Sequence, residues 1–505
     1  MERAGKDRGA EEARPGVEPG PTGDEARPRR KRRRWFALVL ALAHLLGFSS
    51  SLDALMSTRT SQGAIAWIVS LNTVPLAAVP AYWVFGRSKF QGYVTLRQEI
   101  HETYREAAEA VMDELAPFVV EPTEPGSPAL VGSRLAEIPY LRGNAVELLV
   151  DGEATFDSIL AGVAAAEDYV LVQFYIVRDD GLGRRLRDAL VERARAGVRV
   201  WFLYDEIGSH GLPASYRAEL EQAGARVSPF HSTRGSGNRF QLNFRNHRKI
   251  VVVDGHAGWV GGLNVGDEYL GLDPEFPGWR DTHLRVEGPA VLGLQLSFLE
   301  DWRWARDVIL DLPWEPRAAA DGSDAVVLAL PSGPADPLET ASLMYQQAIH
   351  AARERVWIAS PYFVPDEGIL SALHLAALRG VDVRVVIPDQ PDSELVRFAA
   401  YAFVDELLAS GVRILRYEAG FMHQKVFLVD DRLAGVGTAN FDNRSFRLNF
   451  EVSALVSDAG FVDEVASMLA ADMEHSREMS LEGVRAKPGW FHALARASFL
   501  AAPIL

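Results

Sequence analysis

Cysteine is absent from the 505 residues, so disulfide bonds, thiol nucleophiles and cysteine-ligated metals are excluded. Lysine is scarce: the chain contains 52 lysines and arginines, and only six of them are lysines. Acidic residues outnumber basic ones, and the formal net charge is −16. A chain this acidic is a poor match for a broad nucleic-acid surface, so no nucleic-acid partner is predicted.

Two of the lysines stand apart from the others. Between Lys89 and Lys487 the only lysines are Lys249 and Lys425, and each belongs to a stretch of the form H-x-K-x4-D-x6-G-x2-N. The two stretches contain His247, Lys249, Asp254, Gly261 and Asn264, and then His423, Lys425, Asp430, Gly437 and Asn440. Unrelated surface positions rarely repeat in step, so this duplication favours a functional motif over solvated lysines and core histidines.

The centre of each motif is a run of apolar residues, at 250–253 and 426–429. Such runs are typical of buried strands, and His and Lys then lie at the entry of each strand. Residues i and i+2 of a strand share a face, so the imidazole and the ammonium group of each motif are expected on the same side.

The duplication extends beyond the motifs. The words YIVRDDG, from Tyr175, and YFVPDEG, from Tyr362, match as closely as the motifs do. The surrounding pattern predicts strands over 169–177, 198–204, 356–364 and 381–387, and helices over 181–196 and 367–379. We therefore predict an α/β fold with two homologous domains, each a β-sheet flanked by helices.

The N-terminal region has the composition of a membrane anchor. A basic run at 29–34 precedes an apolar segment at 35–52, and a second apolar segment covers 63–85. Each is near the roughly 20 residues that span a bilayer. Basic residues also follow the second segment, which predicts a transmembrane helical hairpin with both ends in the cytoplasm. The alternative for the first segment is a cleaved signal peptide.

The predicted organisation therefore has six parts. They are a disordered basic tail at 1–34, the hairpin at 35–89, an amphipathic helix and Pro-rich linker at 90–134, a first domain at 135–315, a second domain at 324–487 and a C-terminal segment at 488–505. The last segment is predicted either as an interfacial helix or as a helix packed on the catalytic core.

Four words carry a resemblance to a known family: NHRKIVVVDG from Asn246, WRDTHLR from Trp279, GFMHQK from Gly420 and DNRSFRLNFE from Asp442. They resemble bacterial cardiolipin synthases of the phospholipase D superfamily, and the resemblance covers the chain from about residue 85 to its end. It implies two phospholipase D-like domains at the inner membrane of a bacterium. It also implies transfer of a phosphatidyl group between two phosphatidylglycerol molecules, with cardiolipin and glycerol as products.

The reaction exchanges one phosphodiester for another, so no cofactor is expected. The alternatives are a phospholipase D-type hydrolase, a nuclease, a variant that uses phosphatidylethanolamine, and a membrane scaffold without activity. Two intact motifs argue against the scaffold. The sequence does not decide the acceptor or the oligomeric state.

The residue types suit a phosphohistidine mechanism. One imidazole attacks phosphorus and the other protonates the leaving alcohol; the resemblance assigns these roles to His247 and His423 respectively. Lys249 and Lys425 would neutralise the phosphate oxygens, and the amides of Asn264 and Asn440 would donate hydrogen bonds to them. The spacing lacks carboxylates placed for zinc, so no metal is predicted.

Four carboxylates complete the predicted site. Asp254 and Asp430 end the motif strands and are predicted as structural anchors rather than proton carriers. Glu451 is the candidate that orients His423, and Asp281 is the candidate for His247. Glu268 and Glu275 are rivals of Asp281.

Overall fold

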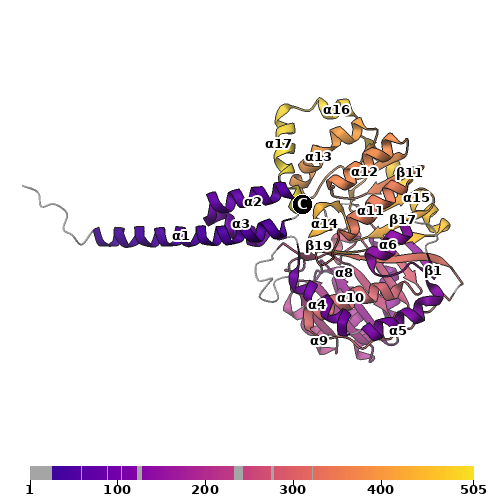
Figure 1. Ribbon diagram of the computed structural model, residues 1–505. Coiled ribbons are helices and arrows are strands. Elements are labelled where there is room, and N and C mark those ends of the chain that lie inside the picture. Colours follow the sequence, from indigo (N-terminus) through magenta and orange to yellow (C-terminus); the bar gives the residue numbers. More distant parts are fainter. Residues whose placement is uncertain are drawn as a thin grey trace, which may run out of the picture. The chain divides into compact units, whose positions relative to one another are not determined.

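The computed structural model describes residues 26–505 except 59, 88, 104, 122–127, 232–242, 275–277 and 321. The chain divides into two compact units, Met1–Arg87 and Ser88–Leu505 (Figure 1). Most of the predicted tail, and nearly all of the predicted Pro-rich linker, lie outside the described residues. The basic run at 29–34 falls inside helix α1 (Ala26–Ser57), so it is helical rather than part of a disordered tail.

Over its described residues, the first unit contains three helices. Among the described helices, α1 alone is long and apolar enough to cross a membrane, over Lys31–Ser57. The second apolar segment is divided into α2 (Ser61–Thr73) and α3 (Pro75–Phe85). The second segment of the predicted hairpin therefore consists of two helices. Pro75 lacks an N–H and disfavours the helical conformation of the residue before it, and Val74 accordingly has φ −131° and ψ 55°.

The second unit contains two halves whose main strands and helices follow the same order, and the second half has additional short elements. The first half consists of β1 (Leu141–Val150), α7 (Asp151–Ala165), β2 (Tyr169–Phe174), α8 (Gly181–Arg195), β3 (Arg199–Asp205), α9 (Ala214–Gln222), β4 (Arg226–Phe230), β5 (Arg245–Asn246), β6 (Ile250–Val253), β7 (Ala257–Gly261), β8 (Trp279–Arg280), β9 (Thr282–Glu287) and α10 (Val291–Arg306). The second half consists of β10 (Ala325–Ser332), α11 (Thr340–Ala351), β11 (Arg355–Ala359), β12 (Phe363–Val364), α12 (Glu367–Leu378), β13 (Asp382–Pro388), α13 (Glu394–Ala409), β14 (Arg413–Tyr417), β15 (Phe421–Met422), β16 (Val426–Val429), β17 (Leu433–Gly437), β18 (Phe441–Asp442), α14 (Asn443–Arg447), β19 (Asn449–Ser457), α15 (Ala459–Glu474) and β20 (Ser476–Glu478).

The two halves share one mixed sheet. Its strand order is β20-β14-β13-β11-β16-β17-β19-β10-β1-β9-β7-β6-β2-β3-β4, with β1 and β10 paired antiparallel at the junction. Counted outward from that junction, the order of one half repeats in the other. The motif strands β6 and β16 therefore occupy equivalent places, and both are fully buried. The predicted α/β class is confirmed.

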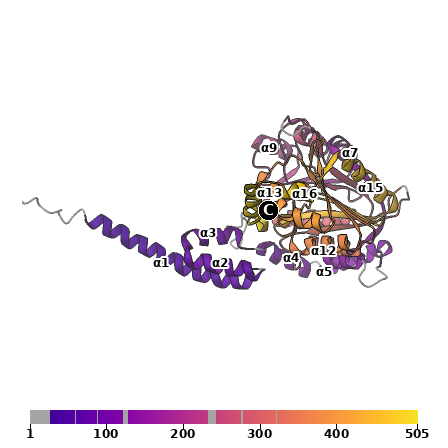
Figure 2. The same ribbon diagram turned by 90° about the horizontal axis from the view of Figure 1, so that it is seen from above.

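Helices cover both faces of the sheet (Figures 1 and 2). One face of the first half packs on α7 and α8, and the same face of the second half packs on α11 and α12. The remaining faces pack on α10 and α15, which contribute to one continuous apolar core. The motif strands are thus held from both sides.

The predicted amphipathic helix is present as α4 (Gln91–Thr103) and α5 (Arg105–Leu115), followed by α6 (Pro128–Ala136). It is part of the second unit, because Phe90 and Tyr93 are 0% and 1% exposed in the same core as α10.

The C-terminal segment forms α17 (Gly489–Phe499) and a 3-10 helix (Ala502–Ile504), and α16 (Leu481–Arg485) precedes it. Phe491 packs on Tyr401 of α13 with ring centroids 4.8 Å apart, whereas Trp490 is 65% exposed. One side of α17 therefore packs on the core and another is open.

Candidate active site

Two short parallel pairings between the halves bring the motifs together. β5 pairs with β19, and the amide of His247 donates to the carbonyl of Phe450 over 2.9 Å. β8 pairs with β15, and the amide of His423 donates to the carbonyl of Arg280 over 2.8 Å. Each motif histidine is therefore positioned by a strand of the opposite half.

The carboxylates are paired across the halves as a result. Nδ1 of His247 lies 2.9 Å from Oε2 of Glu451, and Nδ1 of His423 lies 2.8 Å from Oδ2 of Asp281. The predicted pairing of Glu451 with His423 and of Asp281 with His247 was therefore wrong, because β5 and β8 each extend into the other half. Glu268 forms an ion pair with Arg178 at 2.6 Å, and Glu275 lies outside the described residues.

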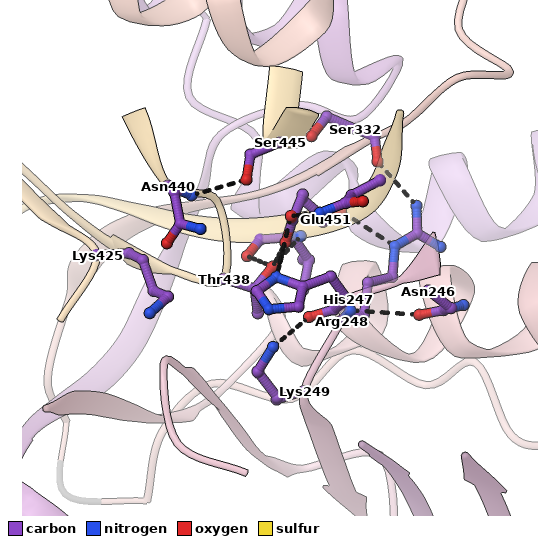
Figure 3. A network of polar contacts seen from close by, with 12 residues as sticks. Asn246, His247, Arg248, Lys249, Ser332, Lys425, Thr438, Asn440, Ser445 and Glu451 are labelled. Atoms are coloured by element: carbon purple, nitrogen blue, oxygen red, sulfur yellow. Dashed lines mark hydrogen bonds and ion pairs between the residues drawn. The ribbon is translucent and has the colours of Figure 1, made fainter. Parts of the chain in front are cut away.

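Glu451 is 0% exposed, and both oxygens of its carboxylate accept hydrogen bonds (Figure 3). Besides His247 it accepts hydrogen bonds from the hydroxyl of Thr438 and, over 3.1 Å, from Nδ2 of Asn449. Burial raises the pKa of Glu451, but His247 and Lys249 outweigh burial, and the pKa falls below its usual value. Glu451 is therefore an ionised acceptor for the Nδ1–H of His247.

Asp281 plays the equivalent part beside His423. Its Oδ1 accepts the amide of Thr282 over 2.8 Å. Burial raises its pKa, whereas Lys425 and His423 lower it, and the net shift is downward. Gly262 makes room for this carboxylate, since a Cβ there would lie 2.0 Å from Oδ1 of Asp281.

The surroundings of both imidazoles favour the neutral form, because the pKa of each ring is lowered. Burial, together with Lys249, lowers the pKa of His247 to about 4, although Glu451 opposes the shift. Burial and Lys425 likewise lower the pKa of His423 to about 4. With Nδ1–H directed at a carboxylate, Nε2 of each ring carries the lone pair, which is the form required of a nucleophile.

The lysines are buried beside the histidines. Lys249 is 0% exposed and donates to the carbonyl of His247 over 2.6 Å; Lys425 is 4% exposed and donates to the carbonyl of His423. Burial lowers the pKa of Lys425 to about 8. Burial also lowers the pKa of Lys249 well below its usual value, and the nearby charge of Lys425 lowers the pKa of Lys249 further. The two motifs therefore face one another, and their shared positive charge suits an anionic ligand.

The two asparagines differ in their surroundings. Oδ1 of Asn264 accepts the amide of Ile176 over 3.1 Å, and its Nδ2 donates to the hydroxyl of Tyr269 over 3.0 Å. Asn264 thus holds neighbouring loops. Oδ1 of Asn440 is buried and has no hydrogen-bond partner within the part of the chain that the structure describes.

Asp254 and Asp430 end the motif strands in the left-handed region, with φ of 50° and 52°. The carboxylate of Asp254 accepts the amides of residues 167–169, and that of Asp430 accepts the amides of residues 353–355. Both side chains therefore anchor the motif strand to the neighbouring strand.

Several side chains of the site were missed in the sequence. The ring of Tyr175 lies 5.0 Å from that of His247, and the ring of Trp279 lies 5.1 Å from that of His423. Both belong to words already noted, and their aromatic character beside a motif was the available signal. Over the described ranges, no group of three His, Asp and Glu side chains is placed to hold a metal ion.

Comparison with known proteins gives a consistent result. The family model described as "Cardiolipin synthase, PLD-like domain" matches residues 159–276 and 345–473. Cardiolipin synthase A of Pseudomonas aeruginosa (strain LESB58) is 48% identical over 489 residues, covering 95% of this chain and 99% of the relative. Cardiolipin synthase A of Pseudomonas putida (strain F1) is 47% identical over 453 residues, covering 89% and 94%.

A solved structure shares the fold. Phosphatidylserine synthase of Haemophilus influenzae Rd KW20 matches with a TM-score of 0.58 at 16% identity, covering 75% of this chain and all of that one. The predicted family resemblance is confirmed. The chain belongs to the cardiolipin synthase family of phospholipase D-like proteins.

Proposed function

We propose that the protein transfers a phosphatidyl group from one phosphatidylglycerol to the terminal hydroxyl of another, giving cardiolipin and glycerol. The observation that carries the proposal is the pair of neutral imidazoles, each held through Nδ1 by a carboxylate of the opposite half. Two buried ammonium groups beside them supply the charge that a phosphodiester requires.

In the first half-reaction, Nε2 of His247 attacks phosphorus. A P–N bond forms while the P–O bond to the glycerol headgroup breaks, and His423 gives its proton to the leaving oxygen. His423 must be protonated for this step. The bound phosphodiester anion raises its pKa, because negative charge favours the imidazolium.

In the second half-reaction, the terminal hydroxyl of a second phosphatidylglycerol attacks the same phosphorus. His423 takes the hydroxyl proton and the P–N bond breaks, which releases cardiolipin and restores His247. Lys249 and Lys425 stabilise the non-bridging oxygens in both steps, and we assign Asn264 and Asn440 to the same oxygens. Asn440 is the better supported of the two, because Nδ2 of Asn264 already donates to the hydroxyl of Tyr269.

Products distinguish this function from its alternatives. Purified protein in mixed vesicles should convert phosphatidylglycerol into cardiolipin and free glycerol in equal amounts, as measured by mass spectrometry. Phosphatidic acid as the main product would favour a phospholipase D-type hydrolase. Release of ethanolamine from phosphatidylethanolamine, with cardiolipin formed, would identify the variant that uses this donor.

The motif lysines should not tolerate arginine. Lys249→Arg and Lys425→Arg keep the charge, but a guanidinium is larger and differs in reach within a fully buried site. We expect each change to lower turnover by on the order of tenfold or more, which corresponds to about 1.4 kcal/mol. Lys487→Arg, outside both motifs, is the matched control. Near-normal rates in both motif variants would show that neither ammonium group contacts the phosphate.

We also propose that α1 and the α2–α3 segment form a hairpin in the bacterial inner membrane, with the catalytic unit in the cytoplasm. Both shorter helices lie along α1: Asn72 donates to Ser51 over 2.8 Å, and Tyr82 donates to Asp53 over 2.7 Å. Basic residues flank the segment at both ends.

Because the chain has no cysteine, single-cysteine variants report this topology directly. A membrane-impermeant maleimide added to spheroplasts should label Ser61→Cys, and should label Glu474→Cys only after the membrane is opened. Labelling of Glu474→Cys in intact spheroplasts would place the catalytic unit outside.

We also expect the open side of α17 to touch lipid. A polarity-sensitive dye attached to Trp490→Cys should then show the emission of an apolar environment in anionic vesicles. Water-like emission would contradict this contact.

A further inference from the structure

The segment before and within α4 is held tightly against the catalytic core. The amide of Phe90 donates to the carbonyl of Pro334 over 3.2 Å. Arg97 forms ion pairs with Glu300 and Asp336, both at 2.8 Å. Phe90 and Tyr93 are thereby buried, although they lie outside the duplicated halves and follow directly after the membrane anchor.

The aromatic rings of this segment pack on the strand that carries Glu451. The ring of Tyr93 lies 4.7 Å from that of Phe450, and the ring of Phe90 lies 5.6 Å from it. Phe450 accepts the amide of His247 through its carbonyl and immediately precedes Glu451. The rings therefore support the backbone that sets the distance between His247 and its carboxylate.

The hydroxyl of Tyr93 completes a buried polar cluster behind the same pair. It donates to Oδ1 of Asp301 over 2.8 Å. Oδ2 of Asp301 lies 2.9 Å from Nη1 of Arg248 and accepts a hydrogen bond from Nδ2 of Asn246 over 2.8 Å. Nε of Arg248 then donates to the carbonyl of Glu451 over 3.0 Å (Figure 3). The chain of contacts joins Tyr93 to the residues on both sides of His247.

The His423 side has an equivalent polar cluster, built from residues of the two duplicated halves. There Asp472 of α15 takes the place of Asp301 of α10, and Gln424 takes the place of Arg248. Gln424 donates to Asp472 over 2.7 Å, and Arg280 binds the same carboxylate at 2.7 and 2.9 Å. Every member of that cluster belongs to the duplicated halves, so Tyr93 is an addition specific to the His247 side.

We propose that Tyr93 is a positioning residue for the His247–Glu451 pair, so that the segment linking the membrane anchor to the catalytic unit also sets the geometry of the nucleophile. The inference rests on the proposed function, because it concerns the rate at which His247 attacks phosphorus. Burial and the charge of Asp301 raise the pKa of Tyr93 well above its usual value, so the hydroxyl stays a donor across the working range of pH.

Tyr93→Phe in the full chain tests the proposal. Tyr140→Phe is the matched control, because the hydroxyl of Tyr140 is buried but has no hydrogen-bond partner among the described residues. In single-turnover experiments with phosphatidylglycerol vesicles, the rate constant does not depend on the folded fraction of the protein. We expect Tyr93→Phe to lower the rate constant of the first half-reaction about tenfold, and to leave KM unchanged in steady-state assays. Tyr140→Phe should leave it unchanged.

A double-mutant cycle separates positioning from general loosening. If Tyr93 acts through Glu451, adding Tyr93→Phe to Glu451→Gln should have little further effect. Additive losses, a raised KM or an unchanged rate would each overturn the proposal. An inactive wild-type protein would overturn the proposed function and this inference together, whereas an active wild type with unaltered Tyr93→Phe would overturn the inference alone.

Discussion

Replacing His247 by Asn should abolish the covalent intermediate and lower turnover by on the order of 10⁴-fold or more, because His247 supplies the nitrogen of the P–N bond. Replacing His423 by Asn should lower turnover similarly for phosphatidylglycerol, since the glycerol oxygen then leaves without a proton. The two variants should differ with a donor such as phosphatidyl-p-nitrophenol, whose leaving group needs no protonation. His423→Asn should then react and stall as an adduct on His247.

Intact-protein mass spectrometry after exposure to this donor provides the measurement. We expect a mass increase of one phosphatidyl group in His423→Asn and none in His247→Asn. His350→Asn, in which an exposed histidine is changed, should turn over normally. An adduct on His423 in the His247→Asn variant would reverse the two roles. Absence of an adduct in every variant, at normal wild-type turnover, would contradict the phosphohistidine mechanism.

The motif strands were predictable because their signal is local. Residues 250–253 and 426–429 are apolar without interruption, and the structure has β6 and β16 over the same residues. The repeated order of elements was also predictable, since the words after Tyr175 and Tyr362 recur with their flanking strands and helices. Burial of His247 and Lys249 at the strand entry follows from the same pattern.

The pairing of carboxylates with histidines was not predictable by the same means. Glu451 and His247 are 204 residues apart, and they meet because two-residue strands of each half add to the other. Such short pairings have no periodic signal. The position of Pro75 did carry a signal for the break between α2 and α3, because proline disfavours a helical residue before it. No sequence pattern indicated the part that we propose for Tyr93, because that part depends on the fold that brings α4 next to α10.

Glu451→Gln should lower turnover by about 10² to 10⁴-fold while leaving the site intact. A glutamine amide fills the same space, yet it replaces an ionised acceptor by a neutral group that can also donate. The Nδ1–H of His247 then loses its charged partner, the productive tautomer is less favoured, and the imidazolium character that develops during attack is no longer stabilised. Asp281→Asn should cause a loss of the same order by acting on His423.

Because Glu451 pairs with His247 and Asp281 pairs with His423, the two carboxylate variants should behave differently. Glu451→Gln should resemble a defect in His247, and Asp281→Asn should resemble a defect in His423. With the activated donor, Glu451→Gln should form its adduct slowly, as expected for impaired His247, whereas Asp281→Asn should form the adduct readily and release it slowly to phosphatidylglycerol. Glu268→Gln is the matched control, because that carboxylate pairs with Arg178 instead. The opposite result would be accumulation of the adduct by Glu451→Gln and slow adduct formation by Asp281→Asn. His247 would then depend on Asp281. The contacts that join the two halves at β5–β19 and β8–β15 would in that case not be those that govern catalysis.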